Sequence, residues 1–296
     1  MNDVTVLAII ELMADQLDEA GLSFANGYGQ GTTNAFDEAS WLVLWQLGLA
    51  IDALDEVQHQ TIKADDVADL VMLVEKRIRT RQPAAYLTHE AWLLGVPFYV
   101  DERVIIPRSL IAEVLFDGSI DPWLGEHTTR VLDLCTGNGS LAVLAAMVYP
   151  DVVVDASDIS GDALAVARIN VDKHDLSNRI TLVESDGLAA CTGPYDLIIC
   201  NPPYVNTASM AALPAEFLAE PAQALAGGTD GMDFVRHLFQ TVIGYMSENA
   251  VLVLEIGHEK SHFNQAFPEV EPLWLGTSAG DEQVLLLTRD QLALSS

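Results

Sequence analysis

The spacing of apolar residues divides the chain into two parts with different expected secondary structure. Up to about residue 88, apolar residues recur every three or four positions, which predicts helices. The first helix is expected to end at Gly21, the second to be capped by Asp37, and the third to be capped by Asp65 or Asp66 and to end before Pro83. The apolar stripe of the first helix consists of Val6, Leu7, Ile10, Met13 and Leu17. Residues 1–88 are therefore expected to form a small helical domain.

Residues 89–108 have a different pattern. Short apolar runs at 92–94, 98–100 and 104–106 are separated by turn residues and end before Pro107. Such runs are typical of short strands. We expect a β-hairpin linker between two domains.

From about residue 128 the pattern alternates between short β-rich runs and helical stretches. The expected strands are Arg130–Leu134, Val152–Ala156, Ile180–Glu184, Asp196–Cys200, Val251–Ile256 and Gln283–Thr288, with a further short strand at Leu273–Leu275. The expected helices are Ser140–Tyr149, Gly161–Asp172 and Gly231–Met246. Strands that alternate with helices favour an α/β fold with a parallel, doubly wound sheet, here ending in an antiparallel hairpin. This domain is expected to span residues 109–296.

The charge of the chain narrows its possible partners. Asp and Glu number 43 and Lys and Arg 14, so the formal net charge is −29. An acidic protein is poorly suited to stable nucleic-acid binding, because duplex binding needs a basic footprint. It is suited to small molecules or basic proteins, although acidity can also reflect the host's proteome or habitat.

Targeting signals and membrane segments are not expected. The first twenty residues contain no Lys or Arg, and the most apolar stretch, residues 141–149, is far too short to span a bilayer. Cys135, Cys191 and Cys200 are odd in number and lack CxxC spacing, as is typical of reduced thiols. A cytoplasmic protein without a membrane partner is expected.

The densest basic run lies at the end of the third expected helix, at Lys76, Arg77, Arg79 and Arg81. It could contact RNA, or it could complement the partial negative charge at a helix C-terminus. The second interpretation is favoured, because charge runs are usually solvated helix faces.

The segment from Val131 to Ser140 predicts a nucleoside-binding turn. A strand runs into Gly137 and Gly139 and then into a helix, and Asp158 follows nineteen residues after Gly139, at the end of the next strand. Glycines let the backbone approach a ligand, and an acid at that place can accept the hydroxyls of a ribose. An ordinary strand-to-helix turn is the alternative.

The acidic residues in this region indicate which nucleoside could bind. The carboxylate of Asp133 would repel a pyrophosphate and suits a cationic ligand such as S-adenosyl-L-methionine. Asp186, after the third strand, could accept the adenine amino group or could equally be a solvated loop residue. With Thr136, these acids and glycines are the candidate cofactor-binding residues.

Asn201-Pro202-Pro203-Tyr204, directly after the strand 196–200, predicts a rigid pocket for a planar amino group. Two prolines stiffen the backbone and donate no N–H, so nearby carbonyls remain acceptors, and the Asn201 side chain adds another. Tyr204 could stack on the planar group or face a cation. A plain Asn-Pro turn is the alternative.

His258-Glu259-Lys260-Ser261-His262 fits the H-E-x-x-H pattern of zinc proteases. The motif follows an expected strand and Gly257 at an expected helix start, and no third ligand is evident. We interpret it as a chance match and predict no metal.

Together these motifs resemble the S-adenosylmethionine-dependent amino methyltransferases, and more narrowly the protein-(glutamine-N5) methyltransferases that modify release factors and a ribosomal protein. Ile105–Ser109 resembles the family's linker signature, and Glu220-Pro221 with Ala224-Leu225 and Gly228–Gly231 resembles its post-catalytic loop. The segments Tyr28–Thr32, Asp37–Ala39 and Ala85–Thr88 are most similar to the branch acting on large-subunit ribosomal protein L3. One departure is Cys135, where the family often has glycine.

The resemblance implies a helical substrate-recognition domain, a hairpin linker and a class I seven-stranded Rossmann-like methyltransferase domain. It implies methyl transfer from S-adenosyl-L-methionine to a glutamine side-chain amide, with a basic ribosomal protein as the partner. The implied catalytic residues are Asn201, Pro202, Pro203 and Tyr204, and the implied substrate-binding residues are Pro107, Arg108, Asn201, Pro202 and Tyr204. Asn201 would also contact the cofactor.

Three alternatives remain open at this point. The protein could methylate release factors, it could methylate a nucleobase amino group of the adenine N6 type, or it could be a non-catalytic ribosome-associated module. The net charge of −29 counts against the nucleobase reaction, since that enzyme must hold nucleic acid.

Overall fold

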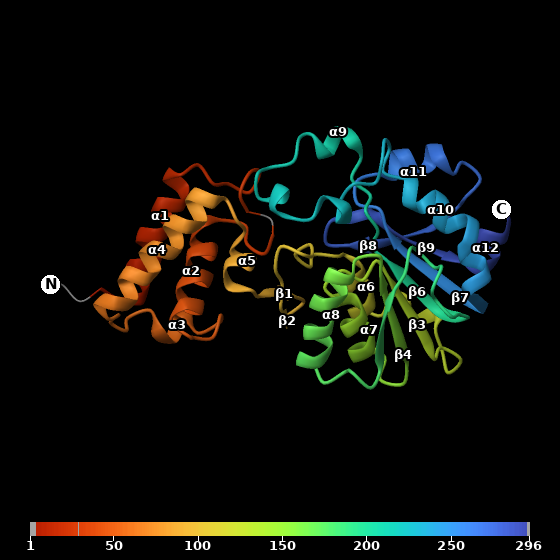
Figure 1. Ribbon diagram of the computed structural model, residues 1–296, viewed down its shortest axis with the longest axis horizontal. Coiled ribbons are helices and arrows are strands. Elements are labelled where there is room, and N and C mark those ends of the chain that lie inside the picture. The colour runs from red at the N-terminus through yellow and green to blue at the C-terminus, as the bar shows by residue number, and fades with distance from the viewer. Residues whose placement is uncertain (1–3, 29, 295–296) are drawn as a thin grey trace. The chain divides into compact units, whose positions relative to one another are not determined.

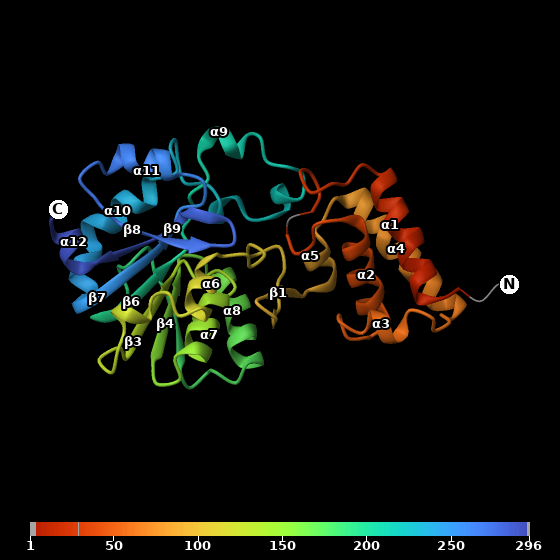
Figure 2. The same ribbon diagram turned by 180° about the vertical axis from the view of Figure 1, so that it is seen from behind.

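The computed structural model describes residues 4–28 and 30–294, and the chain forms two compact units (Figures 1 and 2). The first unit runs to Ala91 and also includes Leu213–Glu220. The second unit comprises Trp92–Ala212 and the chain from Pro221 onward. The segment 213–220 therefore belongs to the first unit, although the sequence pattern groups it with the C-terminal domain.

Helices form the first unit, as the sequence predicts. They are α1 Val6–Glu19, α2 Ala35–Gln46, α3 Leu54–Val57, α4 Ala64–Thr80 and α5 Ala84–Thr88. Gly21 follows α1 with a left-handed φ of +75°, which only glycine adopts without steric cost. The predicted caps are wrong for two helices. The side chain of Asn34 caps α2 by accepting the N–H of Asp37, and α4 begins after Lys63 with no side-chain cap, so that Asp65 and Asp66 lie in its first turn.

Two residues of the basic run at the end of α4, Arg77 and Arg81, differ from both interpretations of the sequence, whereas Lys76 and Arg79 are exposed at the helix end. The guanidinium of Arg77 is fully buried and pairs with Glu38 at 2.8 Å and with Glu216 at 3.1 Å. It also donates to the backbone carbonyl of Gly27 at 2.7 Å, and Arg81 pairs with Glu216 at 2.6 Å. Arg77 is thus an internal ion-pair partner, and it ties the segment 213–220 to the helices of the first unit.

The linker contains a shorter hairpin than the sequence predicts. Strands β1 Ala91–Leu93 and β2 Val96–Phe98 form a two-stranded sheet. The apolar run at 104–106 is not a strand: its side chains at Val104 and Ile106 are buried, but its backbone is irregular. The apolar run 104–106 therefore reflects buried side chains and not a paired strand.

The second unit is built on a seven-stranded sheet with the order β5-β4-β3-β6-β7-β9-β8. The strands are β3 Arg130–Leu134, β4 Val153–Asp158, β5 Ile180–Glu184, β6 Tyr195–Cys200, β7 Met246–Glu255, β8 Leu273–Thr277 and β9 Gly280–Thr288. Strands β3 to β7 are parallel to one another, whereas β9 is antiparallel to β7 and β8 is antiparallel to β9. The predicted doubly wound α/β fold with a terminal antiparallel hairpin is confirmed.

Helices cover both faces of this sheet (Figure 1). The helices that pack on the sheet are α6 Ile111–Phe116, α7 Ser140–Val148, α8 Gly161–Lys173, α10 Asp233–Thr241, α11 Lys260–Ala266 and α12 Arg289–Leu294. The short helix α9 Thr207–Met210 and 3-10 turns at Asp121–Trp123, Ala222–Ala224 and Val242–Tyr245 lie in connecting segments, and a further 3-10 turn at Phe217–Ala219 belongs to the first unit. The expected helix 231–246 is thus a shorter α-helix followed by a 3-10 turn, and β7 starts five residues before the expected strand.

Alternation along the strands creates two cores. In β6, Leu197 and Ile199 pack with α6 and α7 on one face, whereas Ile198 and Cys200 pack with α10 and α11 on the other. Because helices cover both faces of the sheet, the sequences of its strands are almost continuous apolar runs. Within the described part of the chain, no helix has both the length and the hydropathy to cross a membrane.

Candidate functional site

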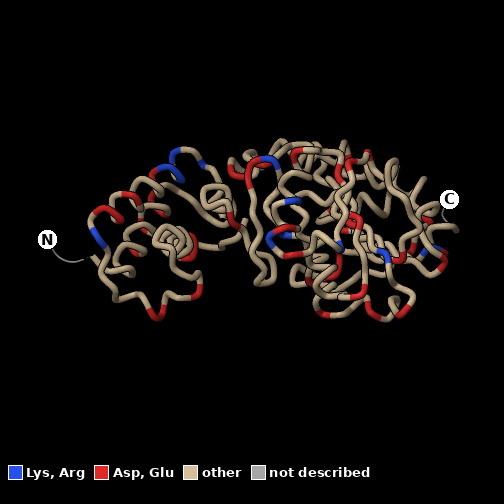
Figure 3. The backbone as a smooth tube through the Cα atoms, turned by 60° about the horizontal axis from the view of Figure 1, so that its bottom comes forward, with Lys and Arg blue, Asp and Glu red and all other residues tan. Residues whose placement is uncertain are grey.

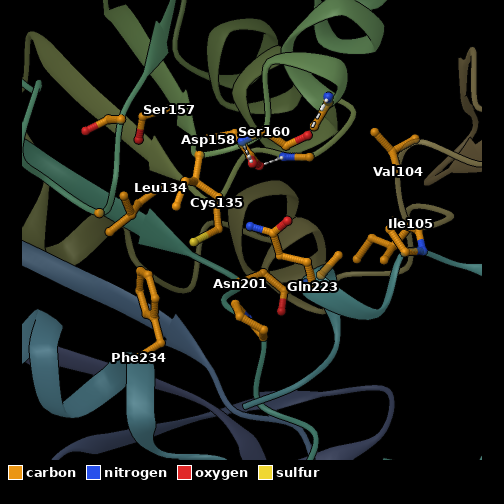
Figure 4. A pocket seen from close by; sticks show the side chains of 18 of the residues that line it. Val104, Ile105, Leu134, Cys135, Ser157, Asp158, Ser160, Asn201, Gln223 and Phe234 are labelled. Carbon is orange, nitrogen blue, oxygen red and sulfur yellow. Dashed lines mark hydrogen bonds between the residues drawn. The ribbon is translucent and has the colours of Figure 1, made fainter. Parts of the chain in front are cut away.

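A cavity of about 320 Å³ lies at the carboxyl ends of β3, β4 and β6 (Figure 4). Leu134 and Cys135 line it from the end of β3, Ser157 and Asp158 from the end of β4, and Asn201 directly after β6. Ligands of open parallel sheets bind at this edge, because the strand order reverses there and leaves a crevice. Here the chain proceeds from β3 outward to β4 and β5 and then returns to β6 on the other side of β3.

The turn after β3 is built from left-handed residues. Cys135, Gly137 and Gly139 have φ values of +64°, +55° and +81°. A side chain at Gly139 would place its Cβ 3.1 Å from the Cβ of Ala167 on α8, so glycine lets the turn pack closely on that helix. The left-handed φ at Cys135 explains why glycine suits this position in the family, since a left-handed L residue costs about 1–2 kcal/mol.

Asp158, the last residue of β4, binds this turn directly. One of its carboxylate oxygens accepts the N–H of Gly137 and the other accepts the N–H of Ser160, both at 2.9 Å. Burial raises the pKa of Asp158, and these backbone donors oppose the rise. The carboxylate is held in place and each oxygen retains acceptor capacity, which is what a pair of ribose hydroxyls requires.

Asp133 lies below the turn and is not among the residues that line the cavity. It is fully buried, and one carboxylate oxygen accepts the Thr136 hydroxyl at 2.5 Å and the Ala142 N–H at 2.9 Å. Its other oxygen has no hydrogen-bond partner among the described residues. Burial raises the pKa of Asp133 to about 7, and the bonds from Thr136 and Ala142 limit the rise.

The raised pKa of Asp133 predicts a pH-dependent stability. The carboxyl titrates near 3.8 in an unfolded chain and near 7 in the folded protein, so between these values the folded state holds a proton that the unfolded chain has released. The free energy of unfolding should therefore fall as the pH rises from about 4 to about 7. Asp133→Asn retains the acceptor for Thr136 and should flatten this slope in urea titrations. An unchanged slope would show that Asp133 is ionised throughout this pH range.

The Asn-Pro-Pro-Tyr motif follows β6, the strand next to β3, and contributes to the wall of the cavity beside the turn. Asn201 and Pro203 line the cavity, whereas Pro202 is buried and Tyr204 directs its hydroxyl to Glu255 at 3.2 Å. The motif is anchored by hydrogen bonds on either side of Val205, which donates to the carbonyl of Leu225 at 2.8 Å and accepts from Gly227 at 2.9 Å. The post-catalytic loop therefore holds the motif directly.

The predicted site residues separate into two groups. Gly137, Asp158, Asp186, Asn201 and Pro203 line one cavity. Asp133, Thr136, Gly139, Pro202, Tyr204, Pro107 and Arg108 are not among the residues lining it. Pro107 is buried, and Arg108 donates to the carbonyl of Ile106 at 3.2 Å.

Sequence reasoning missed several residues of the site. Residues 103–105 of the linker line the cavity, slightly before the expected Pro107 and Arg108, and Gln223 and Phe234 line it from the region after the motif. Figure 4 shows the Gln223 carboxamide next to Asn201. The resemblance of Glu220-Pro221 and Ala224-Leu225 to the family loop was a signal for Gln223, although it assigned no role to that residue.

The H-E-x-x-H segment has a structural arrangement of its own. Glu259 accepts a hydrogen bond from Asn206 at 2.6 Å and pairs with the ring nitrogen Nδ1 of His262. Among residues 4–28 and 30–294, no group of three His, Cys, Asp or Glu side chains is placed to hold a metal ion.

The sheet order, the glycine turn, the acid at the end of β4 and the proline motif after β6 together define an α/β methyltransferase of class I. Residues 120–242 match the methyltransferase small domain family. The chain is 51% identical to the ribosomal protein uL3 glutamine methyltransferase of Bordetella pertussis, over 89% of each chain. It is 45% identical to that of Burkholderia pseudomallei, over 97% of this chain and 95% of the relative. The chain belongs to the family of ribosomal protein uL3 glutamine methyltransferases, and the family resemblance seen in the sequence is confirmed.

Solved structures support the fold at much lower identity. The hMettl16 catalytic domain in complex with MAT2A 3′UTR hairpin 6 is 13% identical and has a TM-score of 0.51 over 76% of this chain and 81% of that one. Such a likeness concerns the architecture of the methyltransferase domain only.

Proposed function

We propose that this protein transfers a methyl group from S-adenosyl-L-methionine to the side-chain amide nitrogen of a glutamine in ribosomal protein uL3. The names of the relatives support the substrate, and the site supports the chemistry. A uL3 substrate would place the reaction in the cytoplasm.

The observation that carries this proposal is the state of Asn201. Its carboxamide lines the cavity, and no described residue hydrogen-bonds this side chain. Asn206, five residues later, differs, because its side chain donates to Glu259 and accepts from Ser209. A polar group at a cavity wall with unused acceptor capacity is suited to a ligand that donates N–H bonds.

The residues of the chain fit S-adenosyl-L-methionine. Asp158 would accept the ribose hydroxyls, Gly137 would let the backbone approach, and Asp186 would accept the adenine amino group. The unpartnered oxygen of Asp133 has unused acceptor capacity below the turn, and the deprotonated form of Asp133 adds negative potential that suits a cation. When bound, this cofactor supplies a methyl group on a positively charged sulfur.

The chain's role in the reaction is to hold and orient the glutamine amide. An amide nitrogen is a poor nucleophile because its lone pair is delocalised into the carbonyl. The Asn201 side-chain carbonyl and the Pro202 backbone carbonyl would accept its two N–H bonds and fix its direction. These acceptors interact more strongly as positive charge develops on nitrogen, so they stabilise the transition state. Residues 201–204 themselves carry no basic side chain, so the proton of the methylated nitrogen would pass to water after transfer.

The charge of the protein supports a basic protein substrate. Acidic residues are spread over both units, and basic residues are few (Figure 3). A net charge of −29 raises the association rate of a positively charged partner at low salt. We propose no stable partnership with nucleic acid or with a membrane.

Asp158→Ala should weaken the binding of S-adenosyl-L-methionine about 10- to 100-fold, because hydrogen bonds to a charged group contribute about 1.5–3 kcal/mol. Calorimetric titration measures this change. Asp162→Ala, which removes an exposed carboxylate four residues later, is the matched control and should change Kd less than about threefold. An unchanged Kd in Asp158→Ala would remove this residue from the cofactor site.

The proposed function is tested by mass spectrometry of ribosomal proteins and release factors from cells with and without this protein. We expect uL3 to lack one methyl group on glutamine in the deletion strain, and purified protein with labelled cofactor to restore it. Loss of methylation on a release factor, or on a nucleobase, with uL3 unchanged would overturn the proposed substrate.

A further inference from the structure

Glu255 is a buried carboxylate to which the sequence gave no role. It is the last residue of β7 and is 3% exposed. The parallel register pairs Leu254 with Cys200, so Glu255 lies beside Asn201 at the edge of the sheet that bears the cavity. A buried carboxylate needs donors to offset its lost hydration, and its partners therefore indicate what it holds.

The donors to Glu255 come from two different walls of the cavity. One carboxylate oxygen accepts the Tyr204 hydroxyl at 3.2 Å. The other accepts the Ser109 hydroxyl at 2.6 Å and the Leu110 N–H at 2.9 Å. Tyr204 ends the motif that contributes Asn201, and Ser109 directly follows the linker, whose residues 103–105 line the cavity.

Packing against Gly257 also restricts the Tyr204 ring. A Cβ at Gly257 would lie 2.5 Å from the Tyr204 ring, so the ring rests directly on the glycine backbone. The same glycine has a left-handed φ of +53°. The ring is thus held by its contact with Gly257, and its hydroxyl is directed to Glu255.

We infer that Glu255 is a positioning residue for methyl transfer, because one carboxylate sets the distance between the Asn-Pro-Pro-Tyr wall and the linker wall of the cavity. This inference rests on the proposed function above. A carboxylate suits the role because it only accepts hydrogen bonds and can accept several at once. Small displacements of a positioned reactant lower rates steeply, so loosening either wall lowers turnover more than it lowers cofactor affinity.

Two conservative substitutions test this role. Tyr204→Phe and Ser109→Ala each remove one hydroxyl donor to Glu255 and leave the ring or the backbone in place. Each should lower kcat on uL3 about tenfold, with the KM for uL3 and the Kd for the cofactor changed less than about threefold. The double variant should lose less than the product of the single effects, because both act through one carboxylate. Ser109→Thr retains the hydroxyl and should recover most of the rate.

The chain offers matched controls for both substitutions. Tyr195→Phe removes a tyrosine hydroxyl that donates to Asp155 at 2.7 Å, and Ser247→Ala removes a serine hydroxyl that donates to Asp196 at 2.7 Å. Neither residue lines the cavity. Both variants should keep kcat within about twofold at a temperature where all variants are folded. If Tyr204→Phe and Ser109→Ala behave like these controls, Glu255 has no positioning role.

A second measurement does not depend on the substrate. Ser109→Ala should speed amide hydrogen exchange at Val205 and Gly227, whose N–H bonds anchor the motif, without speeding exchange in β3. Unchanged exchange would overturn the inference whatever the substrate proves to be. Faster exchange together with a wild-type protein inactive on uL3 would instead refute the proposed function and leave the coupling of the two walls intact.

Discussion

Replacing Asn201 with alanine should lower kcat at least about 100-fold, while the Kd for S-adenosyl-L-methionine should change less than about threefold. The substitution removes an acceptor aimed at the nitrogen on which positive charge develops, and the loss of one such preorganised group costs about 10²–10³ in rate. Cofactor affinity should persist, because Asp158, Gly137 and Asp186 lie on the other walls of the cavity. Single-turnover methylation of uL3 and calorimetric titration measure the two effects separately.

The matched control for this variant is Asn206→Ala. It removes the same side chain from the same loop, but the carboxamide of Asn206 is already satisfied by Glu259 and Ser209. We expect kcat within about threefold of the wild type. Asn201→Gln keeps the carboxamide but moves it by one methylene. Because the acceptor is then displaced from the amide nitrogen, we expect a strongly lowered kcat in this variant as well. Wild-type turnover in Asn201→Ala would refute the assignment of the amide acceptor.

Replacing Arg77 with alanine should lower the free energy of unfolding by about 3–5 kcal/mol. Removing one partner of a buried ion pair leaves the other charge buried without compensation, and this is far more costly than losing a surface pair. Here Glu38 and Glu216 would both remain inside the first unit, without their shared guanidinium. Urea unfolding followed by circular dichroism measures the change.

Arg79→Ala is the matched control, because Arg79 lies two residues later on α4 and is exposed. It should change the free energy of unfolding by less than about 0.5 kcal/mol. Glu38→Gln with Arg77→Met should be less destabilising than Arg77→Ala alone, since fewer charges remain unpaired. A loss below about 1 kcal/mol in Arg77→Ala would contradict the buried ion cluster.

Parts of the candidate site could be predicted because their chemistry is local in sequence. The glycine turn after β3 and the motif after β6 each lie directly behind an apolar strand, and parallel strands bring their carboxyl ends to one edge. Asp158 and Asn201 were predicted from this reasoning, and both line the cavity. The residues alone predicted methyl transfer to an amino group without identifying the substrate. The family resemblance then indicated that the substrate is a glutamine amide.

Local competition between equivalent residues was harder to resolve. Both Asn34 and Asp37 are good helix caps, and the sequence favoured Asp37 although Asn34 accepts its N–H in the structure. The apolar run 104–106 was expected to pair as a strand, but its buried side chains pack without a strand partner. An apolar run such as 104–106 predicts that its side chains are buried, but it does not predict whether the backbone forms a strand.

The sequence by itself determined the α/β class, the order of elements and the residues at the ends of the strands, because periodicity and turn chemistry act over a few residues. Only the tertiary structure decided which polar groups meet across long separations. Ser109 and Glu255 are 146 residues apart, and Arg77 and Glu216 are 139 apart. No local pattern relates such residues, since it is the burial of each charged side chain in a packed core that selects its partners.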